Sequence, residues 1–119
     1  MDYRKTFFSN NPPVIHNNYF CAYCGKLVNK ENITVDHLYP IGAVKKDPKL
    51  QKKLKRKGIK DINDKKNLVP ACRTCNKKKS ANLGIWIIKG KIGKHQFLWI
   101  IRHLIRLIII YKFIVIFLI

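Results

Sequence analysis

All four cysteines of the chain lie in two short stretches, Cys21-Ala22-Tyr23-Cys24-Gly25 and Cys72-Arg73-Thr74-Cys75. Each pair places two sulfur atoms on one turn, and two such pairs separated by a long insert match a tetrahedral four-thiolate zinc site. A redox dithiol and ordinary buried cysteines are the alternatives. Two pairs, each close to a turn or a helix start, favour zinc. A site closed by four thiolates has no open position, so the zinc is expected to be structural.

The composition limits what the rest of the chain can be. With 119 residues there is room for one small domain and a tail. A core this small needs an additional stabilising cross-link, such as a bound metal. The formal charge of +19, from 25 Lys and Arg against 6 Asp and Glu, favours nucleic acid or an anionic membrane surface as partner. The first residues contain no apolar run long enough for a secretory signal, so we expect a cytoplasmic protein without disulfides.

The chain divides into four stretches. Residues 1–18 are expected to form an arm with little regular structure, because they are polar and contain an Asn-Asn-Pro-Pro run. Every candidate catalytic or metal-ligating residue lies within residues 19–83. Residues 84–96 look like a glycine-containing connector with a short strand at 85–88. Residues 97–119 are almost wholly apolar.

Two strands are expected between the cysteine pairs, and a helix is expected at the second pair. The β-branched run at 33–35 predicts a strand that delivers Asp36 and His37 at its end. Residues 67–70 predict the second strand, and the second cysteine pair should run into a helix. The fold class is therefore expected to be α+β.

A basic insert at 41–66 separates the two strands and should be helical. Asp47 and Pro48 are suited to a helix start and Gly58 to its end. Only two leucines, four residues apart, are available to dock this helix. We expect its charged face to lie along a phosphate backbone, and a merely solvated helix is the alternative. The expected contacts are Lys52, Lys53, Lys55, Arg56 and Lys57.

The order of the motifs resembles that of HNH endonucleases. The matching residues are Cys21-x-x-Cys24, Val35-Asp36-His37-x-x-Pro40, Asn67-Leu68 and Cys72-x-x-Cys75-Asn76-x-x-Lys79. The resemblance covers roughly residues 19–80, and it is the ordered set that is specific. It implies a zinc-stapled ββα-metal module, in which a β-hairpin and a helix hold one divalent ion against the scissile phosphate of DNA.

The resemblance also implies a role for each polar residue of the motif. His37 would be the general base that activates water, which suits an imidazole near neutral pH. Asp36 and Asn76 would ligate the catalytic ion, and oxygen ligands favour Mg²⁺ or Mn²⁺ over zinc. Asn67 would hold the loop and orient His37 through a hydrogen bond. Lys79 would steady the phosphate.

A second function class stays open at this point. The chain could be a catalytically inactive, zinc-stabilised module that binds nucleic acid through the insert. Asp36, Asn67 and Asn76 would then be caps of helices or turns. RNA is not excluded as the partner in either case.

The apolar tail at 97–119 has the length of a membrane span. Its strongly polar members are Arg102, His103, Arg106 and Lys112. The favourable free energy of inserting the apolar residues into a bilayer exceeds the cost of inserting the cations only narrowly. We expect a C-terminal membrane anchor with the cationic domain on the cytoplasmic side. A buried oligomer contact and a strand packed on the core are the alternatives.

Overall fold

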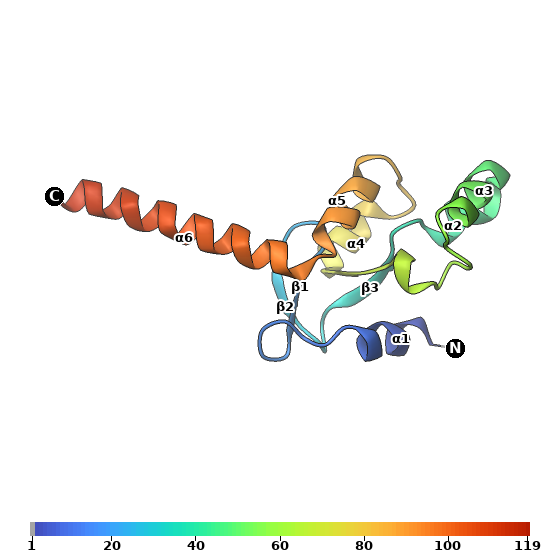
Figure 1. Cartoon of the computed structure of the whole chain (residues 1–119), viewed down its shortest axis with the longest axis horizontal. Coiled ribbons are helices and arrows are strands. Elements are labelled where there is room, and N and C mark those ends of the chain that lie inside the picture. Colours follow the sequence, from blue (N-terminus) through green and yellow to red (C-terminus); the bar gives the residue numbers. More distant parts are fainter. Residues whose placement is uncertain (1) are drawn as a thin grey trace.

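The computed structural model describes residues 2–119, which form a small α+β protein with six α-helices and two two-stranded antiparallel sheets (Figure 1). The expected fold class, α+β, is confirmed at this level. The elements are α1 (Tyr3–Asn10), β1 (Asn18–Phe20), β2 (Leu27–Asn29), β3 (Thr34–His37), α2 (Ile41–Lys46), α3 (Pro48–Arg56), the 3₁₀ turn η1 (Lys65–Asn67), β4 (Leu68–Ala71), α4 (Arg73–Lys79), α5 (Ile85–Gly93) and α6 (Gln96–Leu118).

The first sheet is the hairpin of β1 and β2, and it carries the first cysteine pair at its tip. The backbone N–H of Cys21 donates to the carbonyl of Lys26 (2.8 Å), and the N–H of Gly25 donates back to Cys21 (2.8 Å). Gly25 has φ +78°, a left-handed conformation that glycine adopts without steric cost. The turn therefore depends on this glycine.

The second sheet pairs β3 with β4, and its two faces carry different elements. Asp36 lies opposite Val69, and His37 lies opposite Leu68. Because successive strand residues point to opposite faces, Asp36 faces α4 while His37 faces α1. The order β3, β4, α4 is thus a two-stranded antiparallel sheet with one helix against it.

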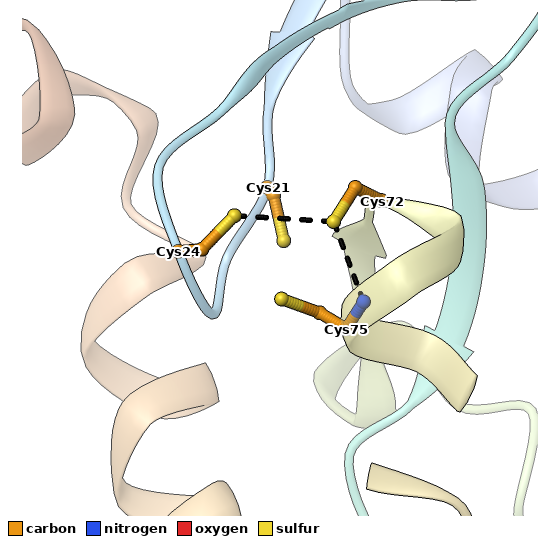
Figure 2. Close-up of side chains that lie close together, drawn as sticks. All are labelled: Cys21, Cys24, Cys72 and Cys75. Carbon is orange, nitrogen blue, oxygen red and sulfur yellow. Dashed lines mark hydrogen bonds between the residues drawn. The ribbon is translucent and has the colours of Figure 1, made fainter. Parts of the chain in front are cut away.

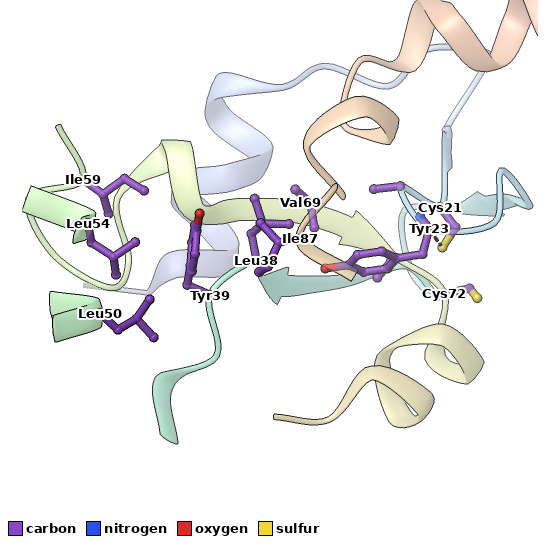
Figure 3. Packing of buried hydrophobic residues seen from close by; sticks show 12 residues of the cluster. Cys21, Tyr23, Leu38, Tyr39, Leu50, Leu54, Ile59, Val69, Cys72 and Ile87 are labelled. Carbon is purple, nitrogen blue, oxygen red and sulfur yellow. Dashed lines mark hydrogen bonds between the residues drawn. The ribbon is translucent and has the colours of Figure 1, made fainter. Parts of the chain in front are cut away.

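The insert between β3 and β4 is helical, as its sequence predicts. Asp47 caps α3 by accepting hydrogen bonds from the backbone N–H groups of Lys49 (3.0 Å) and Leu50 (3.3 Å). Leu50 and Leu54 are the buried residues of α3. They belong to a cluster that continues through Tyr39 to Leu38, beside β4 (Figure 3). Two leucines therefore dock a helix whose other faces are charged.

The prediction of little regular structure in residues 1–18 is wrong. Asp2 caps α1 by accepting from the N–H of Arg4 (2.9 Å), and Phe7 is buried with its ring centroid 6.1 Å from that of Tyr19. The guanidinium of Arg4 also donates to the carbonyl of Ile33 (2.7 Å). The long-range packing of two aromatic rings outweighs the weak local preference of this polar stretch.

The predicted strand at 85–88 is also wrong, because residues 85–93 form helix α5. Two glycines in α5 allow the helix to approach neighbouring segments closely, and they do not break the helix. A Cβ atom at Gly90 would overlap the side chain of Leu38, and one at Gly93 would overlap the carbonyl oxygen of Ala22. The connector is therefore packed directly on the hairpin that carries the first cysteine pair.

Helix α6 is attached to the core by its first turns only. Its Gln96 side chain exchanges two hydrogen bonds with the backbone of Phe20 (2.7 and 2.9 Å), and Trp99 is buried. The rest of the helix projects away from the core (Figure 1), and nearly all side chains from Leu104 on are exposed. The molecule therefore measures 62 Å along its longest axis, against 27 and 24 Å across.

The prediction of a C-terminal membrane span is wrong. Within residues 2–119, no helix combines the length and the apolar character needed to cross a bilayer. The apolar run of α6 is interrupted by Arg102, Arg106 and Lys112, and central cations of this kind are costly in hydrocarbon.

Candidate functional site

The two cysteine pairs meet at one point between the β1–β2 turn and the start of α4 (Figure 2). The four Sγ atoms all lie within 4.8 Å of one another, and those of Cys24 and Cys72 are 3.9 Å apart. All four cysteines are free. A tetrahedral zinc ion with bonds of about 2.3 Å would hold its sulfur ligands about 3.8 Å apart. The cluster therefore has the dimensions of a four-thiolate metal site.

Local hydrogen bonds aim the thiols at this point. Cys72 is the N-cap of α4, and its Sγ accepts from the N–H of Cys75 (3.4 Å), while the Sγ of Cys21 accepts from the N–H of Tyr23 (3.4 Å). Burial raises the pKa of the Cys21 thiol to about 11. A bound cation is what would hold that sulfur as a thiolate at neutral pH. The four cysteines can thus hold a structural metal such as zinc.

On the α4 face of β3, the Asp36 carboxylate is held by two partners. Its Oδ2 accepts from the hydroxyl of Tyr23 (2.6 Å) and lies 3.2 Å from Nζ of Lys79. Burial, and then the nearby Asp36 charge, raise the pKa of Tyr23 far above its usual range, so this hydroxyl stays protonated and donates. The other oxygen, Oδ1, makes no hydrogen bond within residues 2–119, and 12% of the Asp36 side chain is exposed.

Asn76 contacts the same face of β3 one step away. Its Nδ2 donates to Oγ1 of Thr34 (3.0 Å), and that hydroxyl donates in turn to the carbonyl of Ala71 (2.6 Å). Because the hydroxyl proton is directed to Ala71, Thr34 can only accept from Asn76. The amide orientation is thereby fixed, and the amide oxygen of Asn76 stays available. The structure thus brings Asp36 and Asn76 to one face, each with one oxygen that makes no hydrogen bond within residues 2–119.

His37 lies on the other face of β3 and is 7% exposed. Its Nε2 is 2.8 Å from Oδ1 of Asn63, and its ring centroid is 4.7 Å from that of Tyr3. With Asn63 as acceptor, the proton sits on Nε2 and the lone pair on Nδ1. Nδ1 makes no hydrogen bond within residues 2–119 and is not fully buried, so it reaches solvent.

Asn67 is fully buried and holds the loop after β3. Its Oδ1 accepts from the N–H of Tyr39 (2.7 Å), and its Nδ2 donates to the carbonyls of Tyr39 (3.2 Å) and Ile62 (2.8 Å). These bonds use the whole amide, and the predicted bond from Asn67 to His37 is not among them. Asn63 makes the histidine contact instead. Sequence reasoning missed Asn63, and its place four residues before Asn67 in the same asparagine-containing loop was the available signal.

The cations predicted to contact nucleic acid fall into two groups. Lys79 is fully buried, and its ammonium donates to the carbonyl of His37 (2.9 Å) besides pairing with Asp36. It therefore lies in the interior, whereas a phosphate contact needs a cation at the surface. The insert cations are all exposed on α3 and its C-cap: Lys52, Lys53, Lys55, Arg56 and Lys57.

Comparison with known proteins gives no match to a family model, to a curated protein or to a solved structure.

Proposed function

We propose that the chain is a metal-dependent endonuclease of the HNH type that hydrolyses phosphodiester bonds of DNA. One observation carries the proposal. Strands β3 and β4 and helix α4, which the four-cysteine cluster connects to the first hairpin, gather Asp36 and Asn76 on one face, and His37 ends the same strand as Asp36. Binding alone does not need this set of polar residues at the end of a strand.

His37 is the general base of the proposed reaction. The hydrogen bond from Nε2 to Asn63 leaves a lone pair on Nδ1, the atom that would take the proton from the attacking water. General-base catalysis of this kind typically contributes about 10²–10⁴-fold in rate. In this scheme Asn63 is a positioning residue, because it acts only through the imidazole.

Asp36 and Asn76 are the proposed ligands of a hard cation. Each offers one oxygen, since Lys79 and Tyr23 engage Oδ2 of Asp36 and Thr34 engages the amide nitrogen of Asn76. Within residues 2–119, the four cysteines are the only group of three or more Cys, His, Asp or Glu ligands. Water and phosphate oxygens would therefore complete the shell, as suits Mg²⁺ or Mn²⁺. Such an ion stabilises the negative charge that develops on the phosphate oxygens.

The proposed substrate follows from the charge of the chain. A net charge of +19 and an exposed basic helix favour a polyanion over a small neutral molecule. The insert cations would neutralise backbone phosphates, which contribute affinity without reading the base sequence. DNA is the proposed nucleic acid, with RNA as the comparison substrate in the test.

Plasmid nicking tests the proposal. The parent, carrying zinc, should convert supercoiled plasmid to the nicked form with Mg²⁺ or Mn²⁺ and not without them. His37→Ala should abolish nicking and keep its zinc. His16→Asn is the matched control, because His16 is exposed at a left-handed φ of +49° that asparagine tolerates. Equal nicking by the parent and His37→Ala would rule out the proposed role of His37.

A second candidate function is a zinc-stabilised nucleic-acid-binding module without catalysis. The buried pairing of Lys79 with Asp36 favours it, since the ammonium neutralises the carboxylate that the reaction needs as a ligand. The contact of the Tyr3 ring with His37 also restricts access to the imidazole. Under this alternative, the parent binds DNA in a separate titration and nicks no plasmid with either cation.

A further inference from the structure

Three hollows follow one another across the face formed by the end of α3, η1 and α5. The first, of about 300 Å³, shares Tyr39, Lys57 and Lys91 with the second, of about 440 Å³. The second shares Lys66, Lys94 and His95 with the third, of about 570 Å³. Because neighbouring hollows share lining residues, the three lie next to one another, and we treat the row as one groove.

The groove is lined by cations and by no carboxylate. Six lysines line it, and we call it the lysine groove: Lys53, Lys57, Lys65, Lys66, Lys91 and Lys94. Within residues 2–119 the one ion pair is that of Lys79 with Asp36, so none of the six lysines forms an ion pair. Positive charge held in a concave surface attracts anions more strongly than the same charge on a convex one.

The middle of the groove brings two lysines together from distant parts of the chain. Nζ of Lys57, at the end of α3, lies 6.0 Å from the centroid of the Tyr39 ring, and Nζ of Lys91, on α5, lies 5.9 Å from it. Burial disfavours the ionised form of Tyr39, yet these two ammonium groups outweigh it and lower the pKa of the phenol. The approach of Lys57, with some burial, also lowers the pKa of Lys91, whereas the interactions with Lys91 and Tyr39 raise the pKa of Lys57.

The fold holds these like charges close together at a cost in repulsion. Movement of α5 away from Lys57 would lose the close packing of Gly90 on Leu38 and of Gly93 on Ala22, where there is no room for a Cβ atom. Lys91 lies between these two glycines, so the close packing of α5 fixes its position opposite Lys57. An anion in the groove would relieve the repulsion.

We propose that the lysine groove binds the sugar–phosphate backbone of a DNA duplex, with successive phosphates contacting successive lysines. A single small anion would occupy one hollow. The lysines line three neighbouring hollows, as suits an extended polyanion. Lys53, Lys57, Lys65 and Lys66 belong to the insert, and Lys91 and Lys94 extend the groove beyond it onto α5 and its C-cap. The inference rests on the proposed function only in taking DNA as the partner.

The test is the salt dependence of DNA affinity in the absence of Mg²⁺ and Mn²⁺. A labelled duplex is titrated with zinc-loaded full-length chain in the His37→Ala background, so that cleavage plays no part. The groove variant combines Lys65→Gln, Lys91→Gln and Lys94→Gln. The control combines Lys5→Gln, Lys26→Gln and Lys112→Gln, which are exposed positions outside the three hollows and remove the same charge. Zinc content and circular dichroism establish that both variants are folded.

The groove variant should reduce the slope of log affinity against log salt by about 2–3, close to one unit for each lost phosphate contact. Its affinity at about 0.15 M salt should fall by roughly 10- to 100-fold. The control should change the slope by less than about one unit. Equal changes in the two variants, or an unchanged slope in the groove variant, would overturn the inference. A parent that binds through the groove but never nicks plasmid would refute the nuclease proposal and leave this inference standing.

Discussion

Nζ of Lys79 lies 3.2 Å from Oδ2 of Asp36, and none of the Lys79 side chain is exposed. The same ammonium donates to the carbonyl of His37 (2.9 Å), so one side chain of α4 engages two successive residues of β3. A buried ion pair contributes little over a well-packed apolar pair, but removing one partner leaves the other charge uncompensated. The pair therefore fixes how α4 docks on β3.

Asp36→Asn and Lys79→Met should each destabilise the fold by about 3–5 kcal/mol, because each leaves one charge without its partner. The double variant should lose less than the sum of the two, since neither charge remains. Urea unfolding of zinc-loaded chain measures all three free energies. Strict additivity of the single effects would show that the two side chains do not interact.

Gly93→Ala should destabilise the fold by about 1–3 kcal/mol, because the new methyl group would overlap the Ala22 carbonyl oxygen and push α5 from the cysteine hairpin. Gly42→Ala is the matched control in α2, where a Cβ atom meets nothing within 4 Å. That change should stabilise the chain by about 0.4–1 kcal/mol by restricting the unfolded state. Thermal unfolding compares the two, and equal shifts in Tm would contradict the close approach of α5 to the hairpin.

Metal removal should unfold the cysteine-bearing module. Structural zinc in small domains contributes about 10–16 kcal/mol of apparent binding free energy, which is folding free energy where no site exists in the unfolded chain. We expect one zinc per chain by elemental analysis and loss of the circular dichroism signal on addition of a chelator. Cys72→Ser should bind less metal and show the same loss. A chelated chain with an unchanged spectrum would mean that the four thiols only pack together.

Asn63 should act on catalysis through His37 alone. Asn63→Leu removes the acceptor of the Nε2 proton and should lower kcat by on the order of 10- to 100-fold with KM unchanged. Asn63→Asp keeps an acceptor oxygen and should retain most of the activity. Steady-state kinetics, which give kcat and KM separately, make the comparison. A loss confined to KM, or an equal loss in both variants, would assign Asn63 to substrate binding or to folding.

Local signals were enough to predict the parts of the fold that local chemistry determines. The spacing of the cysteines predicted the cluster, and Asp47 before Pro48, with Leu50 and Leu54, predicted α3. The β-branched run before Asp36 predicted β3. In each case the residues that carry the signal are also those that form the structure.

The errors come from contacts between distant segments. Phe7 stabilises α1 by packing against Tyr19. The glycines of residues 84–96 favoured a connector, yet Gly90 and Gly93 let α5 approach Leu38 and Ala22. For the contact of Asn63 with His37 the only local signal was the position of Asn63 close to Asn67, and nothing local shows that a lysine in a run of three becomes the buried partner of Asp36. Such pairings exist only once the chain is folded.

The most direct test of the account is the single-turnover rate of cleavage of a labelled DNA duplex by zinc-loaded parent and by His37→Ala, with Mg²⁺ or Mn²⁺ and enzyme in excess. The two chains should bind the duplex equally and contain equal zinc. The parent should cleave the duplex measurably, and the variant should cleave it at a rate at least about 100-fold lower. Equal rates in the two chains, or no cleavage by the parent with either cation, would rule out a nuclease that uses His37 as its general base.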